Sequence, residues 1–530
     1  MEAGTERRDR SVPARGRWPT SAAVLAGGLP AVVFPAPALW WLAPVALVPW
    51  LLLLRSADSG RRAALRGWLG GTGFMLAVHH WLLPSLHVFL LLLAGLLGLL
   101  WAPWGLLVRR LLGADRPRGG AAVLATLLVP SGWLAVELVR SWEYLGGPWG
   151  LLGSSQWQFP PALRLASLGG VWLVSFVVVA VNTALTVLVA VPSARASAAV
   201  TLLAWAGVVG SAGVWTPLPQ SAGNLRVAVV QPGVVAGPSG AERRFALQER
   251  LTRRLAGRGV ELVVWGESSV GYDLEDRPDL RDRLRRLSRR VGADLLVNVD
   301  ARRPGRQGIF KSSVLIGPAG PDGQRYDKMR LVPFGEYVPA RSLLGWVTSL
   351  GKAAGEDRMR GAAPVVMEPT DGGGPRIGPL VCFESAFPDM GRRLVRRGSA
   401  VLVVQSSTSS FQHSWAPWQH ASLAALRAAE SWRPVVHATL TGVSAVYGPG
   451  GEQVGERLST TGSGAAVYEV PLGVGSSPYV RFGDWIVWTA LGAVGAFGAW
   501  EAFRLLARRR PMPRLEPGQP AETPATRPPG

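Results

Sequence analysis

Three side chains in the sequence together supply the groups needed for covalent acyl chemistry. Cys382, the only cysteine of the chain, follows a short apolar run, as does Glu267, and Lys328 opens a stretch that ends in Glu336. A thiol with a pKa of ~8.5 is mostly protonated at neutral pH, so a neighbouring carboxylate must take its proton as it attacks. An ammonium group then stabilises the oxyanion. The sequence therefore predicts Glu267 as the base, Lys328 as the oxyanion-stabilising residue and Cys382 as the nucleophile.

Taken one at a time, these three residues have ordinary structural explanations. A cysteine after an apolar strand is more often an inert core residue. A glutamate at a strand end is usually a solvated loop charge, and a lysine beside Met329 and Arg330 usually lies on a surface. Only their flanking sequences, considered together, favour the catalytic interpretation.

The composition is typical of a membrane protein. Of 530 residues, 48 % are hydrophobic and only 17 % are charged, and the 23 tryptophans fit a chain with many interfacial anchors. The net charge of +21 lies largely in short clusters beside apolar segments, where it reflects topology, and we predict no nucleic-acid partner. One cysteine cannot form an internal disulfide, and without a CxxC or HExxH motif the sequence predicts no metal and no cofactor.

Hydropathy predicts eight apolar spans, several of them close to the ~20 residues that cross a bilayer as a helix. Only Pro35-Ala36-Pro37 separates the first two spans, which form either a short pair or one broken unit. The spans cover residues 20–36, 38–54, 66–83, 88–108, 121–139, 168–191, 198–215 and 484–506.

Arginine clusters predict the orientation of these spans. They occupy the N-terminal tail, the loops after the second and fourth spans, and the C-terminal tail, which all lie on one side if there are eight spans. By the positive-inside rule both termini are cytoplasmic, and the long segment before the last span is extracytoplasmic. A cleaved signal peptide is the alternative for the first span, but no cleavage site followed by a polar start is evident. The predicted domains are a basic tail (1–19), a membrane domain of seven helices (20–215), an extracytoplasmic domain (216–483), a last membrane helix (484–506) and a disordered Pro-rich tail (507–530).

The extracytoplasmic segment has the pattern of an α/β domain. Short apolar runs rich in β-branched residues alternate with arginine-rich helical patterns. Strands are predicted at 225–230, 261–265, 294–299, 313–316, 377–382, 400–404, 435–438 and 443–447, and helices at 241–255, 280–291 and 418–431. Glu267 and Cys382 therefore lie at the ends of predicted core strands.

The sequences around the candidate residues resemble the signature blocks of the nitrilase superfamily, and more narrowly those of the apolipoprotein N-acyltransferase family. These blocks are Val-Val-Trp-Gly-Glu267, Tyr326-Asp-Lys328 followed by Leu-Val-Pro-Phe-Gly-Glu336-Tyr-Val-Pro, and Val-Cys382-Phe-Glu384-Ser-Ala-Phe-Pro-Asp389. Two further runs resemble the narrower family, Gly147-Pro148-Trp149 with Gln156, and Tyr479-Val-Arg-Phe-Gly-Asp484-Trp485. The resemblance covers residues 20–507.

Membership of this family implies an αββα sandwich on an eight-helix membrane domain in the bacterial plasma membrane. It implies that an acyl chain passes from a phospholipid, typically phosphatidylethanolamine, to the thiol. The chain then passes to the amine of the diacylglyceryl-cysteine at the N-terminus of an apolipoprotein. Glu267, Lys328 and Cys382 match the family's triad, and Glu336 and Glu384 match positions that support it. Structural hydrogen bonding is the alternative role of these last two residues.

Three segments concern the substrate. Residues 405–411 and 439–442 depart from the family's usual Asn-Asp-x-Trp-Phe and Thr-Asn-Asn-Gly runs, and both are expected near the substrate mouth. These departures bear on the preference for acyl donor or acceptor and leave the triad intact. Residues 341–362, which include Trp346 and Met359 and have no clear period, are the predicted lid.

The sequence leaves two other functions open. A nitrilase-like hydrolase would use the same triad and discharge the thioester with water, although a small soluble amide needs no membrane platform. A catalytically inactive scaffold that binds lipoproteins or another membrane enzyme is the second alternative, and the two departing segments keep it open.

Overall fold

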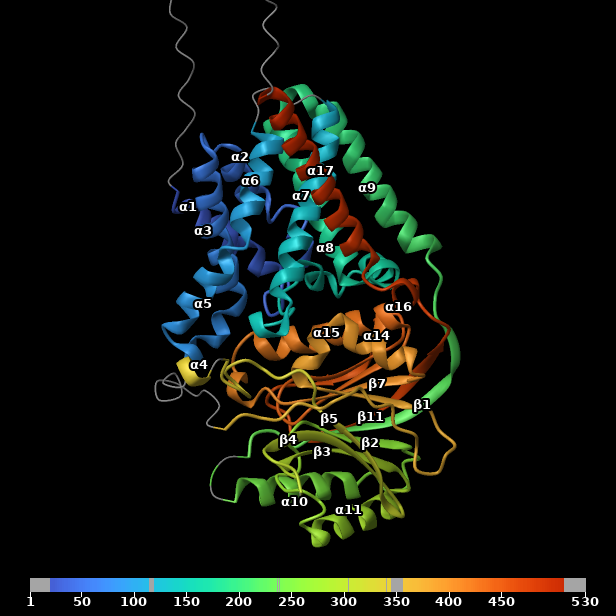
Figure 1. Ribbon diagram of the computed structural model, residues 1–530. Helices are drawn as coiled ribbons and strands as arrows, with labels where there is room; N and C mark the ends of the chain where they lie inside the picture. The colour runs from blue at the N-terminus through green and yellow to red at the C-terminus, as the bar shows by residue number, and fades with distance from the viewer. Residues whose placement is uncertain are drawn as a thin grey trace, which may run out of the picture.

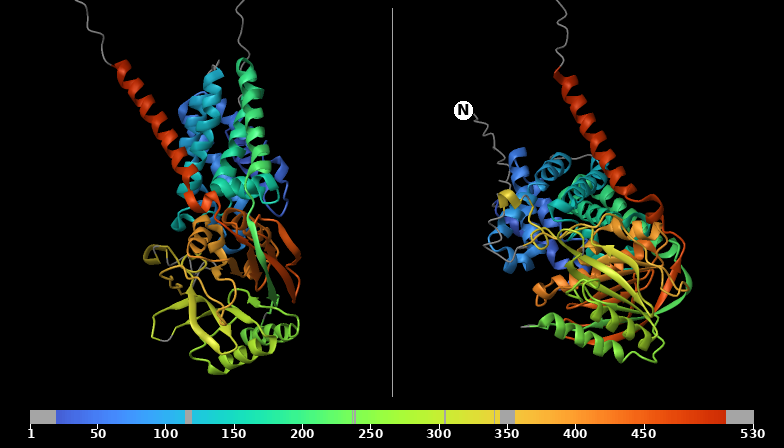
Figure 2. Two further views of the ribbon diagram at one scale, coloured as in Figure 1. Left: turned by 90° about the vertical axis from the view of Figure 1, so that its right-hand side faces the viewer. Right: turned by 60° about the horizontal axis from the view of Figure 1, so that its bottom comes forward.

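The protein folds into a helical domain and an α/β domain (Figure 1). The computed structural model describes residues 20–509 apart from 114–118, 236, 238, 304, 340 and 345–355. Figure 2 shows the same arrangement from two other sides, with the helices at one end and the sheets at the other. The predicted N-terminal tail and most of the predicted C-terminal tail fall outside the described residues.

Five helical segments among the described residues are long and apolar enough to cross a bilayer. They are Phe89–Leu112, Gly119–Arg140, Pro160–Ala190, Pro192–Trp215 and Trp485–Ala507. The helices of this domain are α1 (Ala22–Gly28), α2 (Val48–Arg55), α3 (Gly60–His79), α4 (Leu83–Leu86), α5 (Phe89–Gly98), α6 (Trp101–Leu112), α7 (Gly119–Arg140), α8 (Pro160–Ala190), α9 (Arg195–Trp215) and α17 (Trp485–Arg509). The predicted apolar helices are present, but the predicted count of eight spans is not confirmed.

The first two predicted spans are short because the chain leaves the helix between them. At about 1.5 Å per residue, Ala22–Val33 covers only about 18 Å of a hydrocarbon core of about 30 Å. The second span has a further irregular stretch before α2, and a buried side chain from α8 binds its backbone groups. Asn182 Nδ2 donates to Ala43 O at 2.7 Å, and Leu47 N donates to Asn182 Oδ1 at 2.9 Å. Irregular backbone is tolerated at membrane depth only with such internal partners.

The third predicted span corresponds to α3, whose glycines lower its hydropathy and let its neighbours approach. A Cβ on Gly70 would lie 2.1 Å from the Trp50 ring, and a Cβ on Gly73 would lie 2.0 Å from Val24 O. Small residues are the usual means of close helix packing in membranes. This helix is therefore built for contact inside the domain rather than for contact with lipid.

Two contacts gather arginine-bearing segments at one end of the helical domain. Arg109 Nε, in α6, donates to Ala57 O in the loop after α2 at 2.9 Å. Arg110 Nη2 pairs with Glu501 Oε2 of α17 at 2.7 Å. In Figure 1 this is the end of the domain away from the sheets. Three of the predicted arginine clusters therefore share one end.

Two sheets form the centre of the α/β domain. Their strand orders are β11-β1-β2-β3-β4-β5 and β10-β9-β8-β7-β6. The first sheet contains β1 (Gln220–Gln231), β2 (Leu262–Trp265), β3 (Asp294–Arg302), β4 (Ile309–Gly317), β5 (Gly320–Asp327) and β11 (Gly464–Val474). The second contains β6 (Ile377–Val381), β7 (Val401–Ser406), β8 (Val435–Thr439), β9 (Ser444–Tyr447) and β10 (Gln453–Leu458). All eight predicted strands are present, and β5, β10 and β11 were not predicted.

Helices cover the outer face of each sheet (Figure 1). α10 (Gly240–Arg253) and α11 (Pro278–Val291) lie on the first sheet, and α14 (Pro388–Arg396) and α15 (Ala416–Ser431) lie on the second. Aliphatic side chains such as Val229, Val264 and Val403 fill the space between the sheets. Each contributes about 1.5–3 kcal/mol on full burial. The αββα sandwich is thus confirmed.

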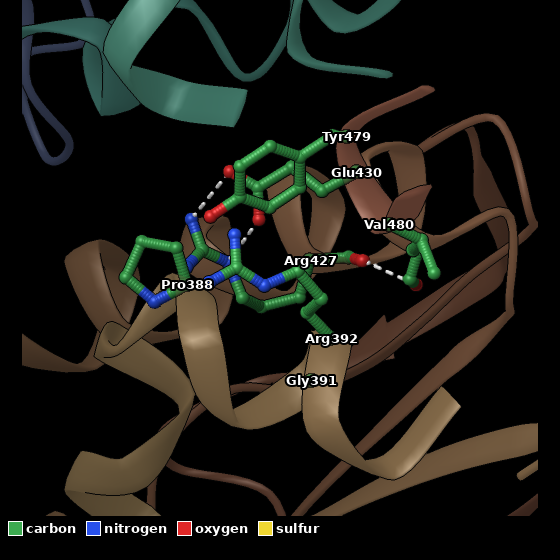
Figure 3. Close-up of a pocket in the computed structure, with 8 residues that line it drawn as sticks. Pro388, Gly391, Arg392, Arg427, Glu430, Tyr479 and Val480 are labelled. Atoms are coloured by element: carbon green, nitrogen blue, oxygen red, sulfur yellow. Dashed lines mark hydrogen bonds and ion pairs between the residues drawn. The ribbon is translucent and has the colours of Figure 1, made fainter. Parts of the chain in front are cut away.

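The helical domain and α15 are joined where α8 breaks. Gly169 and Gly170 leave the helical conformation, the second with φ +71°. Glu430 Oε1, from α15, accepts a hydrogen bond from Val171 N at 2.7 Å, which caps the resumed helix. Arg427 pairs with the same carboxylate at 3.0 Å, and Figure 3 shows these two side chains in the small pocket at the junction. This contact holds α15, one of the two helices on the second sheet, against the helical domain.

Asp484 makes a second joint at the start of α17. It accepts hydrogen bonds from Tyr479 Oη of α16 (Pro478–Phe482) at 2.8 Å and from Trp172 Nε1 of α8 at 3.1 Å. Arg392 of α14 pairs with its other oxygen at 2.8 Å. The two domains are therefore bound to each other through polar as well as apolar contacts.

Candidate functional site

The three candidate residues lie at strand ends of the two facing sheets. Glu267 follows β2, Lys328 follows β5, and Cys382 follows β6. Lys328 Nζ lies 3.4 Å from Glu267 Oε1, and the charges of both residues act on the pKa of the Cys382 thiol. Lys328 is fully buried, whereas Cys382 is only partly buried. The fold thus brings the three candidate residues together at one end of the two sheets.

Left-handed backbone occurs at each of the three sequence blocks. Cys382 has φ +52°, Ser268 after the candidate base has φ +54°, and Phe334 has φ +62°. Such conformations cost a non-glycine residue about 1–3 kcal/mol and persist where the surroundings enforce them. At Cys382 the turn ends β6 and begins the short helix η7 (Cys382–Ala386), so the thiol lies outside the ladder of the sheet.

Glu336 fixes the position of Lys328. Lys328 Nζ donates to Glu336 Oε1 at 2.8 Å, and Val332 N donates to Glu336 Oε2 at 2.9 Å. The second bond anchors the carboxylate to the backbone of the loop. This geometry is suited to the supporting role predicted for Glu336, because a held carboxylate restricts where the ammonium can point.

Glu384 holds the Cys382 turn against the loop that follows Lys328. It is fully buried, and its carboxylate accepts several hydrogen bonds. The donors are Tyr326 Oη (2.6 Å), Met329 N (2.7 Å), Arg330 N (3.1 Å) and Val381 N (2.7 Å). One side chain therefore connects β5, the lysine loop and the nucleophile turn.

We expect Glu384→Gln to lower the free energy of unfolding by about 1–3 kcal/mol, because an amide nitrogen cannot accept the donors that one carboxylate oxygen serves. Thermal unfolding of the detergent-solubilised protein measures this. Tyr326→Phe is the matched control, since it removes one donor and leaves the carboxylate bound to the backbone; its effect should be smaller. Equal melting temperatures for Glu384→Gln and the wild type would contradict the connecting role.

Lys311, which was not predicted from the sequence, is part of the same site. Its Nζ lies 2.8 Å from Glu267 Oε1 and 3.3 Å from Glu336 Oε1. The alternation of side chains along β4 could have indicated this position, because residues 311, 313 and 315 lie on the same face of the strand. Leu315 packs between the sheets, so Lys311, four residues earlier on the same face, points toward the same interior.

Burial and charge set the protonation states of the site. Burial raises the pKa of the Cys382 thiol to about 12, and the negative charge of Glu267 adds to the effect. For Glu267, burial opposes ionisation, but the charges of Lys311 and Lys328 outweigh it and hold its pKa well below the usual range. The resting site therefore has a neutral thiol beside an ionised carboxylate, as a general base requires.

His420, from α15, supports the nucleophile turn through its backbone carbonyl. Its Nε2 lies 3.0 Å from Cys382 O and its Nδ1 lies 3.1 Å from Ser406 Oγ. Because a carbonyl oxygen only accepts, Nε2 carries the proton and Nδ1 accepts from the hydroxyl. Burial lowers the pKa of His420 to about 4, so the ring is neutral. Nothing in the spacing of His420 in the sequence signals this role.

A loop of the helical domain lies against the Cys382 turn. A Cβ on Gly147 would lie 2.6 Å from the ring of Phe383, the residue after the nucleophile. Gly147 has φ +70°, so both its backbone and its lack of a side chain are needed here. Trp149 Nε1 donates to Gln419 Oε1 of α15 at 2.8 Å. The Gly-Pro-Trp run singled out in the sequence therefore forms one wall beside the thiol.

The two segments that depart from the family pattern, 405–411 and 439–442, begin between the sheets. Gln405 Nε2 donates to Trp265 O at 2.8 Å, across the sandwich. Thr439 Oγ1 donates to Gln231 Oε1 of β1, in the other sheet, at 2.9 Å. The starts of both segments thus join the sheets behind the candidate base, and their expected place at a substrate mouth stays a prediction.

The predicted lid, 341–362, falls only in part on described residues. Residues 345–355, which include Trp346, lie outside them. Before this stretch, Arg341–Leu344 forms the short helix α12, and after it Met359 is exposed and lies against Gly308. The lid therefore remains a prediction.

Comparison with known proteins gives matches over both domains. Residues 26–184 match the apolipoprotein N-acyltransferase N-terminal domain, and residues 226–477 match the carbon-nitrogen hydrolase domain. An apolipoprotein N-acyltransferase of Azotobacter vinelandii is 34 % identical over 533 residues, covering 95 % of this chain and 98 % of that protein. One of Geobacter metallireducens is 32 % identical over 508 residues, covering 91 % and 95 %.

Among solved structures, an amidase of the nitrilase superfamily from Nesterenkonia is similar at 23 % identity and a TM-score of 0.36, over 49 % of this chain and 95 % of the amidase. The full-length relatives are more informative, since their identity exceeds 30 % across nearly the whole of both chains. Together with the two domain matches, this shows that the chain belongs to the apolipoprotein N-acyltransferase family.

Proposed function

We propose that the protein moves a fatty acyl chain from a phospholipid, through a thioester on Cys382, to the N-terminal amine of a diacylglyceryl-apolipoprotein. The observation that carries this proposal is the gathering of Glu267, the buried Lys328 and Cys382 at neighbouring strand ends, beside a loop of the membrane domain. The names of the relatives support the lipoprotein acceptor. The family resemblance supports phosphatidylethanolamine as the donor.

In the first half-reaction, Cys382 gives its proton to Glu267 as the sulfur attacks the ester carbonyl carbon. Lys328 stabilises the tetrahedral oxyanion. Collapse of this intermediate breaks the bond to the glycerol oxygen, and Glu267 returns the proton to that oxygen. A lysophospholipid leaves, and the acyl chain stays on Cys382 as a thioester.

In the second half-reaction, the neutral amine of the acceptor attacks the thioester carbonyl. Glu267 takes a proton from the attacking nitrogen, and the oxyanion again forms beside Lys328. Collapse breaks the carbon–sulfur bond, and the proton on Glu267 passes to the departing sulfur. The amide product and the resting thiol result. Excluding water from the thioester favours the amine over hydrolysis.

We also propose that the α/β domain is extracytoplasmic. The contacts of Arg109 with Ala57 and of Arg110 with Glu501 support this, because they gather arginine-bearing segments at the end of the helical domain away from the sheets. Arginine-rich loops mark the cytoplasmic side. Both termini are then cytoplasmic, and the thiol acts at the outer surface of the plasma membrane.

Lys328→Met is expected to slow the first half-reaction by about 10²–10³-fold, the usual loss for one oxyanion donor. Release of lysophospholipid under single-turnover conditions measures the chemical step, and co-sedimentation with vesicles measures lipid association. The substitution should leave lipid association unchanged, because the ammonium is fully buried inside the protein. An unchanged rate of release would contradict the role of Lys328.

The proposed function is tested by mass spectrometry of a reporter lipoprotein. Cells that depend on this protein should attach a third acyl chain to the reporter, and cells without it should leave the reporter diacylated. When the purified protein is assayed in phospholipid vesicles, free fatty acid formed equally with and without a diacylated peptide would instead indicate a hydrolase. Binding of the peptide without any acyl product would indicate a scaffold.

A further inference from the structure

Four charged side chains behind the thiol form a ring of alternating charge. We name Lys311, Lys328, Glu267 and Glu336 the charge ring. Each ammonium approaches the Oε1 atom of both carboxylates. The distances are Lys311–Glu267 2.8 Å, Lys311–Glu336 3.3 Å, Lys328–Glu336 2.8 Å and Lys328–Glu267 3.4 Å. With two positive and two negative members, the ring is neutral at rest.

The two lysines of the charge ring lie directly opposite each other, Lys311 in β4 and Lys328 just after β5. Ser312 pairs with Asp327 in the antiparallel β4–β5 ladder, and Lys328 N donates to Lys311 O at 2.8 Å. Like charges in such a pair repel and destabilise a sheet. A second lysine here is therefore costly unless both carboxylates are ionised between the two, which makes its function a question of charge.

We propose that Lys311 is a positioning residue for the reaction: it balances the charge ring, so that Glu267 is ionised before attack and the site carries a compensating positive charge afterwards. This rests on the proposed function, since it assigns Glu267 as the base. Lys311 acts through Glu267, which it contacts more closely than Lys328 does.

The charge balance follows each proton. At rest the charge ring is neutral and the thiol is neutral. When Glu267 takes the thiol proton, the ring gains one positive charge, which matches the one negative charge of the oxyanion. Without Lys311 the ring would begin with one negative charge and end neutral, facing an unbalanced anion in a buried site. Buried unbalanced charge is expensive, so both stages would suffer.

Other charged and titratable groups around Glu267 do not replace Lys311. Asp300 of β3 lies 3.8 Å from Lys311 Nζ and pairs with Arg358. It is negative, so it cannot replace the positive charge of Lys311. His420 of α15 is neutral, since burial lowers its pKa to about 4. The groups facing Glu267 are Lys311 from β4, Lys328 and Glu336 from the loop after β5, Cys382 from η7, and His420 from α15.

The experiment compares pH profiles of the first half-reaction, measured as lysophospholipid release from phosphatidylethanolamine vesicles in the absence of acceptor. Omitting the acceptor removes the titration of its amine. In Lys311→Met the pKa of Glu267 should rise, and because only the carboxylate accepts the proton, the acidic limb of the profile should move up by about 1–3 pH units. Lys311→Arg keeps the charge and should keep the acidic limb at its wild-type position.

A double variant separates charge balance from packing. Lys311→Met/Glu336→Gln retains one ammonium and one carboxylate, so the remaining pair is again neutral. Its acidic limb should return toward the wild-type position, even where its maximal rate is low. A structural role for Lys311 gives no reason for a second substitution to restore the pH profile.

Each outcome decides the inference. An acidic limb in Lys311→Met that coincides with the wild-type limb would overturn it, as would a rate loss that is equal at every pH and that the double variant does not reverse. Wild-type protein that releases no lysophospholipid would instead overturn the proposed function. The two failures are therefore distinguishable.

Discussion

Cys382→Ala is expected to lower acyl transfer by about 10⁴–10⁶-fold, the scale of loss when a covalent nucleophile is removed. The substitution deletes the only thiol of the chain and leaves its backbone bonds in place. The carbonyl of Cys382 still binds His420, so the turn has the same support. Intact-protein mass spectrometry after incubation with phospholipid measures the acyl-enzyme, and the reporter lipoprotein measures transfer.

The control for this prediction is the fold of the variant. Alanine fits the space left by the thiol, and the melting temperature of Cys382→Ala should remain close to that of the wild type. An acyl adduct on the wild type and none on the variant supports a thioester at this position. Transfer by the alanine variant at a rate near the wild type would show that another group carries the acyl chain.

Glu267→Gln is expected to have opposite effects on two reactions of the same thiol. Acyl transfer should fall by about 10²–10⁴-fold, because glutamine cannot accept the proton. Alkylation by a small soluble reagent at alkaline pH should become faster. The negative charge of Glu267 contributes to the raised pKa of Cys382, so its removal increases the thiolate fraction at a given pH.

The pair of measurements makes this prediction specific. A variant that merely misfolds would lose transfer without a gradual shift in the pH dependence of alkylation. Glu456→Gln, on the exposed strand β10, is a matched control that should change neither reaction. If Glu267→Gln alkylates as slowly as the wild type and still transfers the acyl chain, the carboxylate is not the base.

The central strands of the fold and the edge strand β6 were predictable, whereas the other three edge strands were not. The predicted strands are runs of buried apolar residues, such as Leu262–Trp265 and Val401–Ser406. The three unpredicted strands, β5, β10 and β11, each lie at an edge of a sheet. An edge strand has a neighbour on one side only, and β10 in particular carries a polar and largely exposed sequence. Hydrophobic runs therefore report the centre of a sheet and miss most of its edge strands.

The membrane spans show a similar limit. Long uninterrupted helices such as α7 and α9 follow directly from hydropathy. The second predicted span does not, because a buried amide from α8 satisfies the irregular backbone before α2. Such a partner lies more than a hundred residues away, so it is invisible in a sliding window.

The site divides in the same way. Glu267, Lys328 and Cys382 stand beside strand ends within distinctive blocks, and their grouping was predictable. Lys311 lies inside a strand with no distinctive neighbours, and its importance appears only when β4 and β5 are paired. Contacts that depend on strand register, rather than on local sequence, were therefore the part that sequence could not reveal.

The closeness of Gly147 to Phe383 has a practical consequence for inhibitor discovery. A fragment limited to residues 216–483 would lack the helical domain, and the aromatic side chains after the nucleophile would lose the contact with Gly147 that covers them. Compounds selected on such a fragment would fit a surface that the complete enzyme keeps covered. Screening should therefore use the full chain in detergent or nanodiscs, where the wall beside the thiol is intact.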